Sequence, residues 1–161
     1  MNIYKNFLSK ESFKNIQSEI MSDYIPWFYT DGVSFVPDEH FQFTYSFVKD
    51  GEIKCPQRAF DLLSPLLNKL KYKKLSRIKA NLLTKTPTII QHKMHQDQDP
   101  KIKGTSGIFY INTCNGFTVF KNGQKIKSEE NKYVEFNSKI LHAGTSCTDQ
   151  KRRIVLNINY L

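Results

Sequence analysis

The sequence is poor in cysteine and has no long apolar run. Its three cysteines, Cys55, Cys114 and Cys147, are odd in number and widely spaced, which excludes a disulfide framework and a Cys-x-x-Cys zinc knuckle. No apolar run approaches the roughly 20 residues that a membrane helix needs. The first six residues lack a basic flank followed by an apolar stretch, so no secretory signal is visible. These absences predict a cytoplasmic protein with no membrane partner.

Internal repeats and low-complexity segments are absent as well. Apolar residues make up 39% of the sequence and aromatic residues 13%, which is enough to build one core and argues against a disordered or fibrous chain. A length of 161 residues predicts a single domain over 1–161, with a helical and irregular part over 1–75 and a β-rich part over 77–160.

Acidic residues are outnumbered by basic ones. The 24 Lys and Arg exceed the 15 Asp and Glu by 9, so the chain carries a formal charge of +9 and could attract an anionic partner such as nucleic acid. Some of the basic residues cluster, at Lys69, Lys71, Lys73, Lys74, Arg77 and Lys79. A solvated lysine face is the commoner use of such a run, and no RNA-binding signature or zinc finger accompanies it.

Two helical regions are predicted in the first half. Phe13, Ile16 and Ile20 recur at helical spacing, which indicates a helix over 9–24 with Ser9 as its cap. Residues 24–39 contain two prolines and a glycine and are predicted to be irregular. Residues 56–70 have one apolar side, and Pro65 indicates a break or a new helix start.

Strand patterns dominate the rest of the chain. Aromatic and polar residues alternate over 41–48, and short β-rich runs follow at 78–84, 88–92, 106–112, 117–120, 133–136 and 153–160. Glycine- or proline-containing turns separate most of them. Strands of this length and spacing indicate a sandwich or barrel, so we expect an α+β, mainly β fold with the early helices packed on one outer face.

Three residues could form a metal site. His95 and Asp97 lie two apart after the predicted 88–92 strand, so both side chains can point to one side. His142 follows 45 residues later, in the segment LHAG. Two imidazoles and one carboxylate form the facial triad of non-haem Fe(II) oxygenases. A polar surface turn around Gln96 is the plainer interpretation of His95 and Asp97.

The last predicted strand has an unusual polar side. One side carries Arg153, Val155, Asn157 and Asn159, whereas the other is apolar after Arg152 and should pack under the helices. Polar groups on the inner side of a double-sheet domain indicate a pocket. An arginine that points into this pocket offers a bidentate clamp for a carboxylate.

Several segments together carry a family resemblance. SGIFYIN (106–112), GFTVF (116–120), NKYVEFNS (131–138), LHAG (141–144) and RRIVLN (152–157) resemble the iron- and 2-oxoglutarate-dependent oxygenases. The resemblance is closest to the prolyl-4-hydroxylase-like group, including its small phage-encoded members, and covers 77–160.

The resemblance implies a fold, a cofactor and a reaction. It implies a double-stranded β-helix, or jelly roll, in which His95, Asp97 and His142 hold Fe(II). The cosubstrate 2-oxoglutarate and dioxygen then hydroxylate a substrate, with succinate and carbon dioxide as coproducts. Ascorbate is implied as an accessory reductant. A phage-encoded enzyme of this kind would work in the host cytoplasm.

The resemblance also suggests residues for the cosubstrate. Its distal carboxylate would meet a basic residue on the last strand. Spacing from His142 favours Arg152, whereas strand parity favours Arg153, which shares a side with Asn157. Tyr110 matches a family tyrosine that binds the same carboxylate, although core packing is the plainer role of such a residue. Phe28, Tyr29 and residues 31–39 are candidates to cover the pocket.

Other functions remain open at the level of sequence. His92 and His95 form His-x-x-His, but no third zinc ligand lies near in sequence. Cys114 or Cys147 could act as a thiol nucleophile, but no partner motif supports this role. The chain could also be a basic β-domain that binds nucleic acid without catalysis, or an oxygenase that acts on nucleic acid. The favoured hypothesis is an oxygenase that hydroxylates an amino-acid side chain of a peptide or protein, with proline first.

Overall fold

The helices of the computed structural model lie in its N-terminal half, and the model describes residues 1–33, 39–97 and 103–161. Helix α1 spans Lys10–Met21 and begins at Ser9, whose hydroxyl accepts a hydrogen bond from the Ser12 N–H at 3.2 Å. Helix α2 spans Gln57–Asp61, and α3 spans Ser64–Leu67 with a proline in its first turn. The predicted break at Pro65 is therefore confirmed, although α3 ends three residues before the predicted boundary.

Strands form two sheets whose neighbours run antiparallel. The larger sheet has the order β1-β9-β6-β11-β5-β3-β2, with β4 paired to β3, and the smaller has the order β10-β7-β8. The strands are β1 (Asn2–Tyr4), β2 (Phe28–Asp31), β3 (Phe41–Lys49), β4 (Glu52–Ile53), β5 (Leu75–Thr84), β6 (Thr105–Tyr110), β7 (Phe117–Phe120), β8 (Lys125–Lys127), β9 (Lys132–Asn137), β10 (His142–Gly144) and β11 (Arg152–Tyr160).

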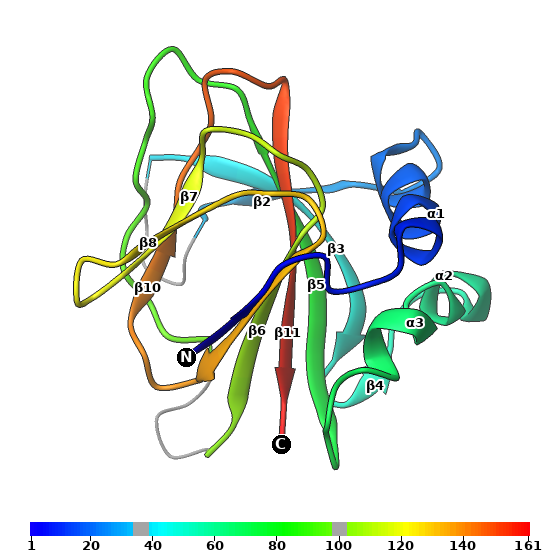
Figure 1. Ribbon diagram of the computed structural model, residues 1–161. Helices are drawn as coiled ribbons and strands as arrows, with labels where there is room; N and C mark the ends of the chain where they lie inside the picture. The colour runs from blue at the N-terminus through cyan, green and yellow to red at the C-terminus, as the bar shows by residue number, and fades with distance from the viewer. Residues whose placement is uncertain (34–38, 98–102) are drawn as a thin grey trace.

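The larger sheet separates two environments. The helices lie against one of its faces, and the smaller sheet lies opposite the other (Figure 1). Apolar side chains of β11, among them Ile154, Leu156 and Ile158, join Phe13, Ile16 and Ile20 of α1 in one buried cluster. Burial of these side chains stabilises the layer by about 25 cal/mol per Å² of apolar surface. A second cluster on the inner face includes Ile108, Val134 and Phe136.

Strand register places polar residues opposite one another on the inner face. Asn157 of β11 pairs with Lys79 of β5, and Asn159 pairs with Arg77. Side chains of paired residues project to the same face of a sheet. The inner face between the two sheets is therefore polar along the centre of the larger sheet, while the helix-covered face is apolar.

Not every predicted element forms. Residues 88–92 were predicted as a strand, but they form only an isolated bridge between Gln91 and Thr145. The segment predicted as irregular, 24–39, contains β2, because its residues pair with Thr44–Phe41 of β3. Residues 34–38 of that segment, part of the suggested pocket cover, lie outside the described residues. In the part of the chain that the structure describes, no helix is both long and apolar enough to span a membrane.

Candidate metal centre

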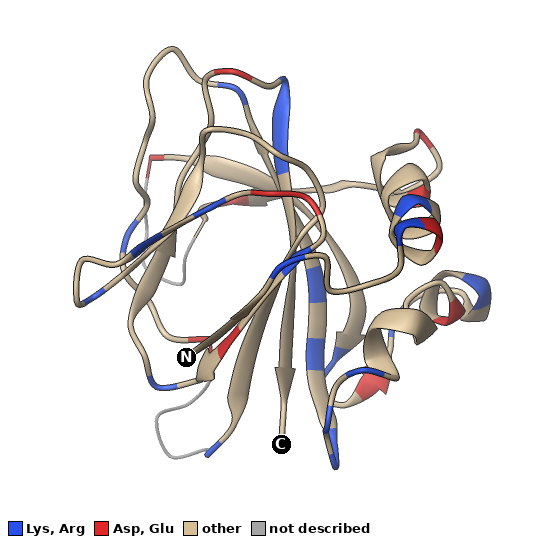
Figure 2. Cartoon of the chain, in the orientation of Figure 1, with Lys and Arg blue, Asp and Glu red and all other residues tan. Residues whose placement is uncertain are grey.

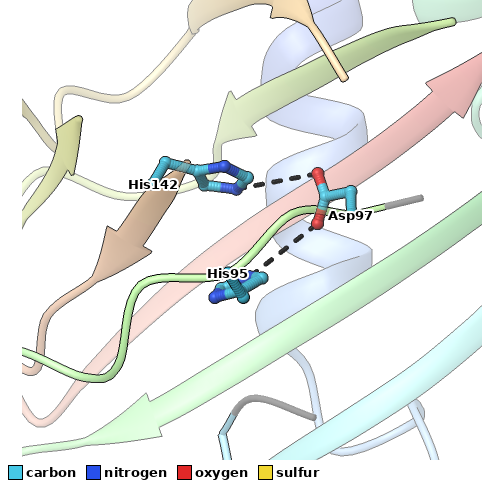
Figure 3. A group of neighbouring side chains, drawn as sticks. All are labelled: His95, Asp97 and His142. Atoms are coloured by element: carbon cyan, nitrogen blue, oxygen red, sulfur yellow. Dashed lines mark ion pairs between the residues drawn. The ribbon is translucent and has the colours of Figure 1, made fainter. Parts of the chain in front are cut away.

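His95, Asp97 and His142 come together between the two sheets (Figure 3). His142 begins β10, and its backbone exchanges two hydrogen bonds with that of His95, at 2.9 and 3.0 Å. This isolated bridge fixes the two imidazoles side by side. Asp97 follows two residues after His95, is 7% exposed and points its carboxylate at both rings.

The ligand atoms of the three side chains surround one point and are too far apart to form hydrogen bonds with one another. His95 Nε2 lies 3.8 Å from Asp97 Oδ1, and His142 Nε2 lies 3.6 Å from Asp97 Oδ2. The ligand atoms all lie within 4.8 Å of one another. These separations exceed a hydrogen bond, but they suit atoms that each bind one ion at about 2.1 Å.

Neighbouring groups orient each ligand. Carbonyl oxygens lie 3.2 Å from His95 Nδ1 and 3.1 Å from His142 Nδ1, and each accepts a hydrogen bond from the ring N–H. This tautomer leaves both Nε2 lone pairs directed at this common point. Asn159 donates to Asp97 Oδ2 at 3.2 Å and to the Ser106 hydroxyl at 2.9 Å, which holds the carboxylate in place.

The electrostatic environment shifts the pKa values of Asp97 and His95 in the direction that suits a bound cation. Burial favours the neutral acid of Asp97, but the charges of His142, Arg77 and His95 outweigh it and lower the pKa of this carboxyl. Burial is also the main cause that lowers the pKa of His95, followed by the charge of His142. One carboxylate and neutral imidazole donors are the ligand set that suits a divalent transition metal, so these residues fit Fe(II).

A cavity of about 170 Å³ adjoins the three ligands. It is smaller than the about 300–1,000 Å³ typical of drug-sized ligands, so it suits a compact molecule. Its wall includes His95, Asp97, His142, Arg153 and Asn157. The cavity therefore runs from the three candidate ligands to the arginine that strand parity had placed on the inner face.

Arg153 is the most unusual residue of this cavity. It is 2% exposed, yet it forms no ion pair within residues 1–33, 39–97 and 103–161. Its guanidinium donates to the hydroxyls of Ser128 at 2.7 Å and Thr118 at 3.2 Å, and to the Thr145 carbonyl at 3.3 Å. Burial lowers the pKa of Arg153, although a guanidinium keeps its proton at neutral pH. A buried cation without a counterion is costly unless an anion joins it.

The ring of Tyr110 lies next to the Arg153 guanidinium. Its ring centroid lies 5.8 Å from the Arg153 guanidinium carbon, and its hydroxyl donates to the Thr118 hydroxyl at 2.9 Å. Tyr110 is fully buried. Tyr110 belongs to the buried apolar cluster of Ile108 and Phe120 and is not among the residues that line the cavity, so it combines core packing with a contact to Arg153.

Gly116 makes room for the arginine, whereas Gly144 only contacts it. A Cβ atom on Gly116 would lie 2.6 Å from the Ser146 carbonyl oxygen and 2.7 Å from Arg153 Cδ. A Cβ atom on Gly144 would lie 3.4 Å from an Arg153 nitrogen. Gly116 is therefore required by the close approach of the Arg153 side chain.

The other residues considered for the site lie elsewhere. Arg152 faces α1, where it donates to the Met21 carbonyl at 2.6 Å, and it does not line the cavity. His92 stacks edge-on against His40 at 5.4 Å and is not part of the group formed by His95. Cys114 and Cys147 group with Asp149 instead of His142.

Sequence reasoning missed several residues of the cavity. Arg77 and Lys79 were treated only as members of a charged cluster, yet they line the cavity together with Asn81. Arg77, Lys79 and Asn81 are spaced two residues apart along one strand, so the alternation of side chains could have predicted that they face the same side. Thr118 and Ser128, which accept hydrogen bonds from Arg153, carry no recognisable signal in the sequence.

The fold belongs to a known class. No protein-family model and no curated protein sequence matches the chain. Solved structures do match it, and they include prolyl hydroxylases and 2OG-Fe(II) oxygenase family proteins. The predicted fold class, a mainly β jelly roll backed by N-terminal helices, is therefore confirmed.

Three structures illustrate the likeness. A prolyl hydroxylase from Trichoplax adhaerens, in complex with a peptide of hypoxia inducible factor, has a TM-score of 0.69 at 12% identity, over 99% of this chain and 82% of its own. A Pseudomonas putida prolyl-4-hydroxylase has a TM-score of 0.65 at 13% identity, over 99% and 90%. The viral collagen prolyl hydroxylase of Paramecium Bursaria Chlorella virus-1, in its 2OG complex, has a TM-score of 0.59 at 16% identity, over 99% and 95%.

Proposed function

We propose that residues 1–161 form an Fe(II)- and 2-oxoglutarate-dependent dioxygenase that hydroxylates an amino-acid side chain of a peptide or protein, with proline as the first candidate. The observation that carries the proposal is the buried Arg153, which has no ion-pair partner among the described residues, in the same small cavity as His95, Asp97 and His142. A dicarboxylate with a keto group beside one carboxylate would satisfy both ends of this cavity.

Each residue has a defined task in this proposal. His95, Asp97 and His142 would hold Fe(II), and two neutral imidazoles with one carboxylate would leave it a net charge of about +1 and open positions. When bound, the iron supplies the activation of dioxygen that couples decarboxylation of 2-oxoglutarate to hydroxylation. Asn159 would keep the Asp97 carboxylate turned toward the imidazoles.

The far end of the cavity would bind and orient the cosubstrate. Arg153 would pair with the distal carboxylate, and the hydroxyls of Ser128 and Thr118 hold its guanidinium in position beforehand. Tyr110 would support the same carboxylate through Thr118, and Asn157 would contribute its amide to the wall of the cavity. The apolar packing around the cavity would exclude water from the reaction.

The test is a succinate-release assay with Fe(II), 2-oxoglutarate and dioxygen, run with and without ascorbate. Substrates are proline-containing peptides, free amino acids and single-stranded nucleic acids, and mass spectrometry identifies a gain of one oxygen atom. We expect succinate in excess of the substrate-free rate with a proline-containing peptide. Oxidation of nucleic acid alone would replace the peptide substrate, and the absence of succinate under every condition would contradict the enzyme.

A matched pair of histidine variants controls this assay. His95→Ala removes a proposed ligand and should abolish succinate formation. His40→Ala removes an imidazole outside the three-residue group and should leave it unchanged. A basic domain that only binds nucleic acid would instead tolerate His95→Ala in its binding.

A further inference from the structure

Two more cations line the cavity beside the candidate metal site. Arg77 and Lys79 lie two residues apart on β5, and both side chains contribute to the cavity wall. Their strand partners on β11 are Asn159 and Asn157, and Ser46 of β3 lies on the other side of Lys79. None of these neighbours carries a negative charge. Figure 2 shows that basic positions continue down β5 toward the turn before it.

These two side chains have no counterion of their own. Within the described ranges, neither Arg77 nor Lys79 forms an ion pair or donates a side-chain hydrogen bond. Asp97 is the carboxylate that acts on both, but its oxygens are directed at the two imidazoles. Burial, followed by the charge of Arg77, lowers the pKa of Lys79 to about 8. An anion placed between Arg77 and Lys79 would favour the charged form of Lys79 and so oppose both causes of the lowered pKa.

The proposed cosubstrate does not account for this pair. Lys79 pairs with Asn157, which lies four residues along β11 from Arg153, or about 13 Å of extended strand. Arg77 pairs with Asn159 and lies farther still. Arg153 would bind the distal carboxylate of the cosubstrate, and the metal would take its keto-acid end, so neither end needs Arg77 or Lys79 on the side of Asp97. They are therefore available to a second molecule that enters next to the metal ligands.

We propose that Arg77 and Lys79 bind an acidic side chain of the peptide substrate, so that the enzyme selects peptides with Asp or Glu near the residue that it hydroxylates. This inference rests on the proposed function. Both residues are specificity-determining: a carboxylate reaches the guanidinium of Arg77 and the ammonium of Lys79 while the reacting side chain faces the metal site.

The chemistry of the surrounding wall favours an acidic peptide over nucleic acid. The side-chain oxygens of Asn81 and Asn157 are buried and have no hydrogen-bond partner among the residues that the structure describes. Such acceptors match the N–H groups of a peptide backbone. Asp31 also lines the cavity, and its carboxylate would repel a nucleic acid, which carries a phosphate at every nucleotide. A peptide with one or two acids satisfies the cations and avoids Asp31.

The test uses matched peptide pools in the succinate assay. Each pool has a central proline, and one flanking position at a time is Asp, Glu, Asn, Gln or Lys. We expect at least one position at which Asp or Glu raises kcat/KM about tenfold or more over Asn or Gln, because a charge-assisted hydrogen bond is lost with the amide. Lys at that position should give the lowest rate. A single-stranded oligonucleotide serves as the competing substrate.

Variants of the two cations then assign the effect. Arg77→Gln combined with Lys79→Met should reduce the preference for acid over amide to about onefold, mainly through KM for the peptide. Lys79→Glu should make the Lys-containing peptides better substrates than the acidic ones. Lys85→Met removes an exposed lysine just beyond the same strand and should keep the wild-type preference.

Several results would overturn the inference. Equal rates with acidic and neutral peptides, an unchanged preference in the double variant, or turnover of the oligonucleotide alone would each do so. A rise in KM for 2-oxoglutarate in Lys79→Met, with no change in peptide preference, would assign Lys79 to the cosubstrate instead. Thermal stabilisation by Mn(II) with N-oxalylglycine separates these failures from failure of the proposed function, since it reports on the metal and cosubstrate sites without any peptide.

Discussion

At the scale of single residues, the candidate site is marked by buried charged side chains whose neighbours do not neutralise them. Arg153 is buried among hydroxyls and a carbonyl, and Asp97 is buried between two imidazoles. A fold gains little stability from a buried guanidinium without a counterion. Such a residue is best understood as preorganised for a ligand, at some cost in stability.

Asp97→Ala tests the carboxylate of the site. We expect at least a hundredfold loss of peptide-dependent succinate formation, or about 2.7 kcal/mol, because a metal ligand contributes more than the surrounding residues whose loss costs about 10–100-fold. Far-UV circular dichroism of the metal-free protein should be unchanged. Activity within threefold of the wild type would show that Asp97 is no ligand.

Arg153→Met tests the cosubstrate clamp. Removing the partner of a buried carboxylate costs about 2 kcal/mol or more, so KM for 2-oxoglutarate should rise about 30-fold or more. Arg152→Met is the matched control, since Arg152 bonds to α1 and does not line the cavity. If Arg152→Met raised KM and Arg153→Met did not, the assignment would be reversed.

At the scale of single residues, the sequence predicted side-chain orientation well where side chains alternate strictly along a strand. The parity of β11 predicted which of two adjacent arginines faces inward, because side chains alternate across a strand. It could not predict that Arg153 forms no ion pair within the part of the chain that the structure describes. Thr118, Ser128 and Thr145 lie 8 to 35 residues away and reach Arg153 only through the tertiary fold.

At the scale of secondary-structure elements, the site depends on how closely the segment before β7 approaches the Arg153 side chain of β11. Gly116, just before β7, allows the Arg153 side chain to pass. Gly116→Ala would place a methyl group at 2.7 Å from Arg153 Cδ, so the arginine must shift. We expect a higher KM for 2-oxoglutarate together with a loss of about 1–3 kcal/mol of stability, measured by urea unfolding.

Gly123→Ala is the control for this glycine. It has a φ of +84° but open space around its Cβ position, so alanine costs stability through backbone strain alone. Its KM for 2-oxoglutarate should match the wild type. An equal rise in KM for both variants would show that general destabilisation, rather than displacement of Arg153, explains the effect.

Elements were predictable where the hydrophobic pattern was long. Strands β3, β5, β6, β9 and β11 follow alternating or apolar runs, and α1 follows its 3.6-residue period. Residues 88–92 were wrongly predicted as a strand, because β propensity alone does not provide a partner strand. The short strands β1, β4, β8 and β10 carry too few residues to show a period.

At the scale of the whole molecule, the order of the strands creates the site. β11, the last strand, lies between β5 and β6, so the C-terminal residues reach the centre of the larger sheet. The bridge between His95 and His142 joins a loop to the smaller sheet and brings the candidate metal ligands together. The sequence predicted two layers and helices on one face, but pairings over such long separations depend on tertiary packing.

The most direct test of the whole account is thermal unfolding with Mn(II) and N-oxalylglycine, a 2-oxoglutarate mimic. With each ligand at about 100 times its Kd, the pair should stabilise the protein by about 2.7 kcal/mol or more. For a chain of this size, that raises Tm by roughly 5–10 °C. The account predicts this rise for the wild type and its loss in Asp97→Ala and Arg153→Met. No rise in the wild type, or an equal rise in all three proteins, would contradict it.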